Sequence, residues 1–564
     1  MANLSKIKRE QMISFLEKLK EQHSDDESLI AINQIEKELT SKKYGLVWEE
    51  HEEEVDVKMQ THIPVFTEVK EREIAAKPNS EEYNFILEGD NLHSLKLLEK
   101  THKGKIDVIY IDPPYNTGSQ KFIYNDCVVD DTDSFKHSKW LSFMSERLLA
   151  ARNLLNSSGI IMISINEIEL YNLKLLCDNI FGEYNFLAKM IWQSTPGSNT
   201  GIEIKTVTEY VLIYAKNKDS CQVAGKVIKD DNKYKFEDEY ISKRGKYILN
   251  KLDRRMTGHH YSDALNYPIK MPDGSYIYAG SYENKQPNWN WRWSKDKVKW
   301  GIDNGFIVMK QGINGQWVVY FKQYQYVNNN DEFIERVLSY QNLIKDLEGA
   351  NSARGTQEIM TLFDGKVFDY PKPISLIKYL LEIHPNKNAC VLDFFAGSGT
   401  TGQAVLELNY EYNYNRKVIL CTNNEGNICE DVTYQRLKTV ITGKRTDGSE
   451  YSEGLPANLK YYKTDFVAKD SEEIYDELLE HIKEMIQLQY GIKIDNKKYV
   501  IIMDDEEMDD FEKNFTDYKD LQAVFINQDV LLSTSQEKIL QDINTYIIPD
   551  CYFDFELREA GELW

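Results

Sequence analysis

Short apolar runs and amphipathic stretches alternate along this chain, and their order predicts its fold. Residues 85–88 and 106–111 are apolar runs of strand length, a pattern typical of buried strands. Between these runs, apolar residues recur at helical spacing at Leu92, Leu95 and Leu98. A strand, a helix and a second strand in this order form a βαβ unit, so we expect an α/β fold with a buried parallel sheet.

The same alternation continues in two further blocks of the chain. The first block has helical spacing over residues 134–155 and 167–181, and strand-like runs over residues 159–165, 187–192 and 210–215. The second block begins with a strand at Cys390 that enters a glycine-rich loop, followed by a helix over residues 403–408 and a strand over residues 418–421. We expect both blocks to build one core.

The two ends of the chain carry elements of their own. Residues 1–45 show helical spacing and a capping box at Ser24 and Glu27, which together predict two helices. Residues 46–80 contain an acidic run and indicate a partly extended connector. A small α/β domain without assigned chemistry is expected near the other end, from helical spacing over 470–489 and strand-like runs at 499–503, 524–527 and 546–549.

Length and composition restrict the class of protein. A chain of 564 residues is too long for one hydrophobic core. We therefore expect five segments, with boundaries at 1–79, 80–217, 218–350, 351–440 and 441–564. The apolar runs are too short to span a membrane, and the N-terminus lacks the pattern of a secretory signal, so a cytoplasmic location is expected. The seven cysteines form no Cys-x-x-Cys pair, which favours reduced thiols over disulfides or a zinc site.

The distribution of charge singles out the middle of the chain. The whole chain has a formal net charge of −23, yet residues 218–350 contain 21 Lys and Arg against 17 Asp and Glu. Basic and amide side chains alternate there with aromatic ones, as in Trp289, Trp291 and Trp293. Such a mixture suits phosphate contact and base stacking, so this region is predicted to recognise nucleic acid. The tryptophans alternate as on a strand, and at least one of them is expected in a core.

The first candidate for chemistry follows the run 106–111 and reads Asp112-Pro113-Pro114-Tyr115. Two prolines donate no backbone hydrogen bond and have a fixed φ, so they hold carbonyl acceptors rigidly beside the Asp112 carboxylate. The Tyr115 ring could stack on a planar group that these acceptors bind. A cluster of acceptors beside an aromatic ring predicts a pocket for an amine-bearing base.

The second candidate is the glycine loop after Cys390, which contains Asp393, Phe395, Gly397 and Gly399 and continues to Gly402. Glycines let the backbone approach a ligand closely, and the start of the following helix offers free N–H groups. By itself this pattern also matches a dinucleotide-binding fingerprint. Further polar residues follow other predicted strands and are expected at the same sheet edge, where they could bind a cofactor: Asp90, Asn91, Asn423 and Glu425.

Together these motifs resemble the amino-methyltransferases of DNA. The segment 110–118 is similar to the form in modification subunits of type III restriction systems, and the catalytic loop precedes the cofactor loop, as in the beta group of these enzymes. The resemblance covers about residues 80–440. It implies a Rossmann-like methyltransferase core with a circularly permuted motif order and an inserted target-recognition domain.

The resemblance also implies roles for individual residues. Asp112, Pro113, Pro114 and Tyr115 would be catalytic and would methylate adenine N6 in double-stranded DNA after base flipping. The cofactor would be S-adenosylmethionine, and no metal is implied. Its expected binding residues are Asp90, Asn91, Asp112, Lys372, Ser375, Asp393, Phe395, Gly397, Gly399, and Asn423 or Glu425 at the ribose.

Expected partners are double-stranded DNA, a second copy of the chain and a separate helicase-nuclease subunit. A solitary DNA adenine methyltransferase is the main alternative. A cytosine-N4 enzyme, whose motif resembles Ser-Pro-Pro-Tyr more closely, is a weaker one. An NAD-dependent oxidoreductase would leave the segment 112–115 unexplained, and a DNA-binding module without enzymatic activity is the remaining class.

Overall fold

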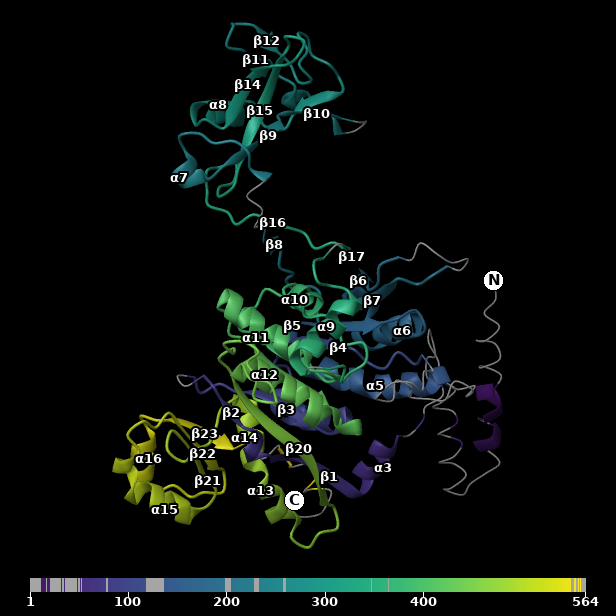
Figure 1. Cartoon of the computed structure of the whole chain (residues 1–564), viewed down its shortest axis with the longest axis vertical. Coiled ribbons are helices and arrows are strands. Elements are labelled where there is room, and N and C mark those ends of the chain that lie inside the picture. Colours follow the sequence, from purple (N-terminus) through teal and green to yellow (C-terminus); the bar gives the residue numbers. More distant parts are fainter. Residues whose placement is uncertain are drawn as a thin grey trace. The chain divides into compact units, whose positions relative to one another are not determined.

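A computed structural model describes residues 53–77, 80–117, 136–197, 204–227, 233–256, 260–345, 347–363 and 365–548, with isolated positions nearer both ends (Figure 1). The chain divides into two compact units, one formed by Met1–Val223 with Gln341–Trp564 and the other by Ala224–Tyr340. The two helices predicted over residues 1–45 lie largely outside the described residues. None of the described helices has the length and apolar character needed to span a bilayer.

One sheet of 11 strands is the centre of the larger unit, in the part of the chain that the structure describes (Figure 1). Its strands follow the order β1 (His62–Glu68), β20 (Asn458–Ala468), β3 (Asn84–Glu88), β19 (Lys417–Thr422), β18 (Cys390–Asp393), β4 (Ile106–Ile111), β5 (Leu155–Ile165), β7 (Thr208–Ala215), β6 (Phe186–Gln193) and β17 (Leu343–Ile344). A short strand, β2 (Ile74–Ala75), pairs with β20. The strands from β20 to β5 pair in parallel, whereas β1 and β7 run antiparallel to their neighbours.

Helices cover both faces of this sheet. From β3 to β4 the chain advances in one direction along the sheet, and from β18 to β19 it advances in the other. Because parallel crossovers are right-handed, helices on these two paths lie on opposite faces. The first face carries α4 (Asn91–His102), α5 (Lys136–Leu154) and α6 (Leu170–Phe181), and the second carries α11 (Thr400–Tyr412) and α12 (Gln435–Thr442), with α9 (Ser352–Phe363) and α10 (Ile374–Leu381) packed on them.

The direction of the strand order changes between β18 and β4, which are hydrogen-bonded neighbours with Leu392 opposite Ile109. In open α/β sheets, such a switch point leaves a crevice at the carboxyl ends of the two strands. The central strands are buried on both faces, which explains their continuous apolar runs. The predicted Rossmann-like α/β fold is thus confirmed.

Two stretches differ from the expected local structure. The connector over residues 46–80 contains a helix, α3 (Glu54–Thr61), and the edge strand β1, because Ile63, Val65 and Phe66 bury their side chains against the core. The helix expected over residues 470–489 is two helices, α13 (Ile474–Glu480) and α14 (Ile482–Tyr490). They meet at His481, whose Nδ1 lies 3.0 Å from the carbonyl oxygen of Phe66.

The end of the chain folds around a small parallel sheet with its own core. Its elements are the strands β21 (Tyr499–Ile502), β22 (Ala523–Asn527) and β23 (Asn544–Ile548) and the helices α15 (Asp505–Lys513) and α16 (Thr534–Leu540). The acidic run at its start is a helix because Asp504 caps it and acidic residues fill the first turn, where the helix dipole favours them.

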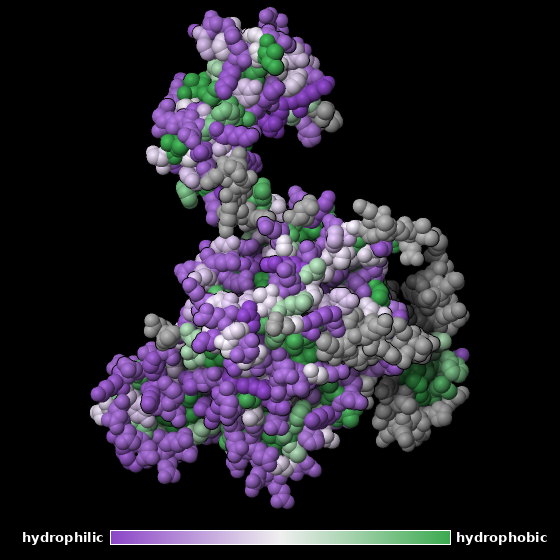
Figure 2. Space-filling model, viewed as in Figure 1, coloured by the Kyte–Doolittle hydropathy of each residue, from purple (hydrophilic) through white to green (hydrophobic). Residues whose placement is uncertain are grey.

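The inserted unit, Ala224–Tyr340, is built from short antiparallel pairs. Its elements are the three-stranded sheet of β9 (Tyr247–Lys251), β15 (Trp317–Tyr324) and β14 (Ile307–Gln311), the pairs β8 (Lys226–Val227) with β16 (Val337–Leu338), β10 (Asp253–Arg255) with β13 (Trp289–Trp291) and β11 (Ile269–Lys270) with β12 (Tyr276–Ile277), and the helices α7 (Ile241–Arg244) and α8 (Lys295–Asp303). Trp291 and Trp293 lie in its core, as their alternation suggests. Hydrophilic residues cover most of its visible face (Figure 2).

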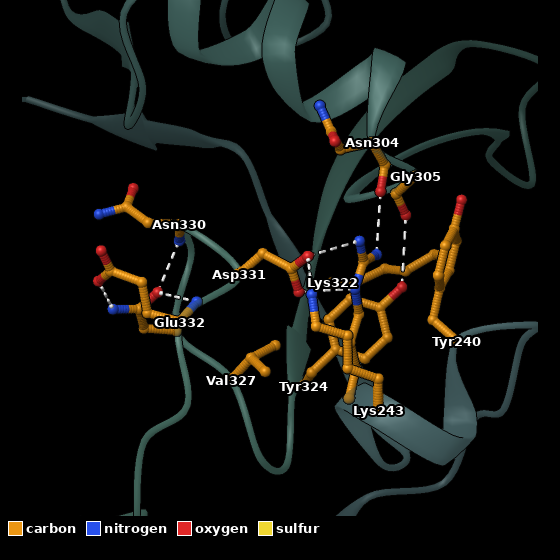
Figure 3. Close-up of polar contacts among 12 residues, drawn as sticks. Tyr240, Lys243, Asn304, Gly305, Lys322, Tyr324, Val327, Asn330, Asp331 and Glu332 are labelled. Carbon is orange, nitrogen blue, oxygen red and sulfur yellow. Dashed lines mark hydrogen bonds and ion pairs between the residues drawn. The ribbon is translucent and has the colours of Figure 1, made fainter.

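Polar side chains link α7 and β15 to neighbouring loops of this unit, and Figure 3 shows the contacts around Asp331 and Asn304. The Arg244 guanidinium donates to Asp331 Oδ1 at 2.9 Å and to the carbonyl oxygen of Asn304 at 2.9 Å. Lys322 Nζ and the Tyr324 hydroxyl both donate to Asp238 Oδ2, each at 2.5 Å. Burial alone would raise the pKa of Asp238, but these two hydrogen bonds outweigh it and lower that pKa. These contacts therefore join α7 to the end of α8 and to the loop after β15, and join β15 to Asp238 just before α7.

Candidate active site

A cavity of about 560 Å³ lies where the strand order changes direction, at the carboxyl ends of β18 and β4. Residues predicted from the sequence form much of its lining: Asp90, Asn91, Asp112, Pro113, Pro114, Tyr115, Lys372, Asp393, Phe395, Gly397, Asn423 and Glu425. Two predicted residues, Ser375 and Gly399, do not line it. The Ser375 hydroxyl is buried and has no hydrogen-bond partner among the described residues.

The catalytic-loop candidate leaves the end of β4 and is held by hydrogen bonds at Pro114 and just beyond Tyr115. Trp140 Nε1 donates to the carbonyl oxygen of Pro114 at 2.8 Å. Asn116 adopts the left-handed conformation, with φ of 57°, and its amide donates to the buried carboxylate of Glu169 at 2.7 Å. Asparagine tolerates this conformation better than most residues. These contacts fix the backbone of the two prolines beside Asp112.

Four side chains meet in this part of the cavity. The Tyr115 hydroxyl donates to Asp112 Oδ1 at 2.8 Å and lies 3.1 Å from Glu209 Oε2. Lys372 Nζ lies 2.8 Å from Asp112 Oδ2 and 3.4 Å from Glu209 Oε2. Burial alone would lower the pKa of Lys372, but the two carboxylates raise it, so the ammonium stays charged. We call Asp112, Tyr115, Glu209 and Lys372 the carboxylate cluster.

The glycine loop follows β18 and is anchored by Asp393. This carboxylate accepts hydrogen bonds from the backbone N–H of Phe395 at 3.0 Å and from the Thr401 hydroxyl at 2.5 Å. Burial raises the pKa of Asp393 to about 7. The loop continues at Gly397, which has a φ of 48° and whose carbonyl accepts from the Thr433 hydroxyl at 2.6 Å. The segment that leads into α12 therefore holds the loop backbone through the Thr433 hydroxyl.

Gly399 and Gly402 do not line the cavity, and their lack of a side chain allows close packing of the backbone against neighbouring elements. Gly399 has a φ of 75°, and a Cβ at this position would lie 3.3 Å from Thr433 Cγ2. A Cβ at Gly402 would lie 2.9 Å from side-chain atoms of Leu420 and Leu437. Both glycines allow the start of α11 to pack closely against β19, α12 and the segment before α12. The position of α11 in turn fixes the glycine loop that leads into it.

A buried arginine links three of the polar residues that line the cavity. Arg147 Nε donates to Asn91 Oδ1 at 2.6 Å, and its terminal nitrogens reach Glu53 Oε1 at 2.7 Å and Asp90 Oδ1 at 3.3 Å. The Asn91 amide in turn donates to the carbonyl oxygen of Phe394 at 2.9 Å. Asp90 also caps α4 by accepting from the N–H of Leu92. Arg147 thus links Glu53, just before α3, to Asp90 and Asn91 at the start of α4, and Asn91 connects them to the glycine loop.

Several lining residues were missed by the sequence analysis. Glu53 belongs to the acidic run assigned to the connector, and Glu209 lies on β7, far from either motif in the sequence. Phe143, whose ring centroid lies 5.8 Å from that of Phe395, lies in the predicted helix over residues 134–155, which was given no role at a site. Glu209 comes just before the apolar run 210–215 that predicts this strand, and no motif in its neighbourhood singles it out.

Comparison with known proteins assigns the chain to a family. The model of a family described as DNA methylase matches residues 106–429, which include both candidate loops. The chain is 30% identical over 437 residues to the StyLTI Mod subunit, a type III restriction-modification enzyme of Salmonella typhimurium, and this match covers 71% of this chain and 62% of the relative. It is 32% identical over 354 residues to the type II methyltransferase M.KpnI of Klebsiella pneumoniae, with 60% of this chain and 79% of the relative covered.

The chain therefore belongs to the DNA methylase family. It spans less than two thirds of the length of the StyLTI relative and of the EcoPI Mod subunit of Escherichia phage P1, of which it covers 56%. Among solved structures, the complex of M1.HpyAVI with SAM matches 62% of this chain and 98% of its own chain, with 14% identity and a TM-score of 0.30.

The packing role of Gly399 predicts the effect of a substitution. We expect Gly399→Ala to lower the free energy of unfolding by more than Gly448→Ala, because both sites have positive φ but only Gly399 has a close neighbour. The conformational strain alone costs about 1–2 kcal/mol. Urea denaturation of the two variants measures the difference, and equal losses would show that the contact with Thr433 is unimportant.

Proposed function

We propose that this chain transfers a methyl group from S-adenosylmethionine to adenine N6 in double-stranded DNA, as the modification subunit of a type III restriction-modification system. One observation carries the proposal: the Asp112–Tyr115 loop and the Asp393 glycine loop line the same cavity at the switch point of the sheet. Membership of the DNA methylase family and the similarity to the StyLTI Mod subunit support it.

The charge of the cavity fits this cofactor. Lys372 is the only lysine or arginine among its described lining residues. Six acidic residues also line it: Glu53, Asp90, Asp112, Glu209, Asp393 and Glu425. S-adenosylmethionine is a net cation, because its sulfonium and ammonium groups outweigh one carboxylate. A nicotinamide dinucleotide carries a pyrophosphate that this cavity would repel. The charge therefore favours the methyl donor over the oxidoreductase alternative.

Different residues of the cavity are assigned to the two ends of the cofactor. We assign Asp393 and the glycine loop at Gly397 to the methionine end. Asp90, Asn423 and Glu425 are assigned to the adenosine end, where carboxylate and amide oxygens can accept from an amine or from ribose hydroxyls. When bound, the cofactor supplies an electrophilic methyl group on its sulfonium.

The catalytic loop supplies acceptors for the target amine. The exocyclic nitrogen of adenine is a poor nucleophile because its lone pair is conjugated with the ring. The Asp112 carboxylate and the Pro113 carbonyl can accept its two N–H groups and draw the nitrogen toward tetrahedral geometry. The Tyr115 ring can stack on a base that has left the duplex. Much of the acceleration would then come from positioning, worth up to about 7–11 kcal/mol in favourable cases.

We assign recognition of the DNA sequence to the inserted unit, within the segment 218–350 predicted from the sequence. Arg254 and Arg255 are exposed and lie on the two-stranded ribbon of β10 and β13, opposite Asn290 and Trp289. A two-stranded ribbon fits the major groove, and arginine pairs with phosphates and with guanine edges. The buried Trp291 and Trp293 are not assigned to base stacking.

The proposed function also implies partners. A type III subunit would act with a helicase-nuclease subunit, and we propose that the chain also forms a homodimer. The similarity to M.KpnI, a type II methyltransferase, favours one second candidate, a solitary methyltransferase. Light scattering distinguishes a monomer from a dimer, and an adjacent gene for an ATP-dependent nuclease would favour the type III assignment.

The role of Asp112 predicts a loss that is specific to the reaction. Asp112→Ala should lower kcat for methylation of duplex DNA by at least about 10²–10³, while the dissociation constant of S-adenosylmethionine changes only a few-fold. Asp219→Ala is the control, because this exposed carboxylate accepts a hydrogen bond from the Tyr184 hydroxyl and neither residue lines the cavity. Radiometric methyl transfer and calorimetry give the two quantities, and full activity of the Asp112 variant would refute the mechanism.

The raised pKa of Asp393 predicts a pH dependence of cofactor binding. Its pKa of about 7 in the free protein means that the carboxyl is largely protonated below this pH, and a cation binds the ionised form better. The affinity for S-adenosylmethionine should therefore fall as the pH drops below about 7. Calorimetry between pH 6 and 8.5 tests this, and Asp393→Asn should remove the dependence. An unchanged slope in the Asn variant would assign the titration to another group.

A further inference from the structure

The carboxylate cluster contains two donors, and each of them is shared between two acceptors. The Tyr115 hydroxyl lies 2.8 Å from Asp112 and 3.1 Å from Glu209, and Lys372 Nζ lies 2.8 Å from Asp112 and 3.4 Å from Glu209. Both donors are therefore closer to Asp112, with Glu209 as their second partner. Within these described residues, each oxygen of Asp112 already has a donor.

This arrangement competes with the target amine for the Asp112 carboxylate. Each Asp112 oxygen can accept a second hydrogen bond, but Tyr115 and Lys372 already draw on its negative charge, so the amine binds more strongly once one of these donors moves away. The Lys372 side chain is only 10% exposed. A buried ammonium without a counter-ion is strongly disfavoured, so the released donor needs another acceptor nearby.

We propose that Glu209 is a positioning residue that receives these donors when the target amine binds Asp112. The inference rests on the proposed function, because it concerns how the adenine amine gains access to the catalytic carboxylate. Lys372, Tyr115 or both would shift from the shorter contacts with Asp112 to the contacts with Glu209. The net charge of the two carboxylates and one ammonium does not change in this exchange, so no proton has to be transferred.

The position of Glu209 suits an acceptor that stays in place. It lies within β7, where it is paired with Trp192 of β6 in the antiparallel register. Trp192 is 2% exposed, and its indole N–H donates to the carbonyl oxygen of Ala350 at 2.6 Å. Pairing of β7 with β6 therefore holds the Glu209 backbone in place. The Lys372 ammonium, in contrast, is at the end of a long flexible side chain and can move between the two carboxylates.

The test compares two duplexes with Glu209 variants. One duplex has adenine at the mapped target position, and the other has purine, which lacks the amine. Affinities are measured with S-adenosylhomocysteine present to prevent turnover. For Glu209→Ala, we expect affinity for the adenine duplex to fall at least tenfold and affinity for the purine duplex to stay within twofold. Calorimetry measures the cofactor affinity separately, and we expect it to fall only a few-fold, because five of the six cavity acids remain.

Two further variants sharpen the test. Glu209→Gln keeps the shape and a neutral acceptor, so its loss should be smaller than that of Glu209→Ala, and it replaces the Ala variant if that one does not fold. Adding Lys372→Met to Glu209→Ala should restore part of the amine-dependent affinity, because no ammonium then needs a new partner. Glu167→Ala, which removes the exposed acceptor of the Tyr210 hydroxyl, is the matched control.

The two duplexes distinguish the exchange of donors from a purely structural role of Glu209. Equal weakening of both duplexes would mean that Glu209 only supports the local structure, and no weakening of either would also overturn the exchange. In either case, N6-methyladenine production by the unsubstituted protein would leave the proposed function intact. Failure of the unsubstituted protein to bind S-adenosylmethionine or to methylate any adenine would overturn both.

Discussion

The parallel pairing of β18 with β4 is the constraint on which the rest of the structure depends. The paired residues Val391 and Val108 are far apart in the sequence, yet their strands are neighbours at the centre of the sheet. The chain leaves their carboxyl ends in opposite directions. Both loops therefore line one cavity. Asp112, which is proposed to bind the target base, thus lies close to Asp393 and Gly397, which are proposed to bind the cofactor.

The charges in this cavity are arranged by the fold rather than by the two loops alone. Arg147, fully buried on α5, brings Asp90, Asn91 and Glu53 together on one wall. Lys372 brings Asp112 and Glu209 together on another. Each cation lies between two or more acids, so the acids can be crowded without all repelling one another, and the cavity still keeps an excess of negative charge for a cationic ligand.

The fold and both loops could be predicted because their signals are local. The strands β3, β4, β5 and β19 are buried on both faces, so each appears as a continuous apolar run followed by polar residues. The strand β1 was missed because its apolar residues follow an acidic run. Glu209 and Glu53 could not be placed in advance, since only the antiparallel register of β7 and the contact with Arg147 bring them to the cavity. Ser375 and Gly399 belong to recognisable motifs, but neither lines the cavity, since Ser375 lies within α10 and Gly399 packs against Thr433.

Transfer of a methyl group from S-adenosylmethionine to adenine N6 is the central claim. The most direct measurement incubates the protein with duplex DNA and S-adenosylmethionine labelled with ¹³C in its methyl group, followed by digestion to nucleosides and mass spectrometry. We predict labelled N6-methyldeoxyadenosine as the methylated product. Labelled N4-methyldeoxycytidine, or no labelled nucleoside from a folded protein that binds the cofactor, would contradict it.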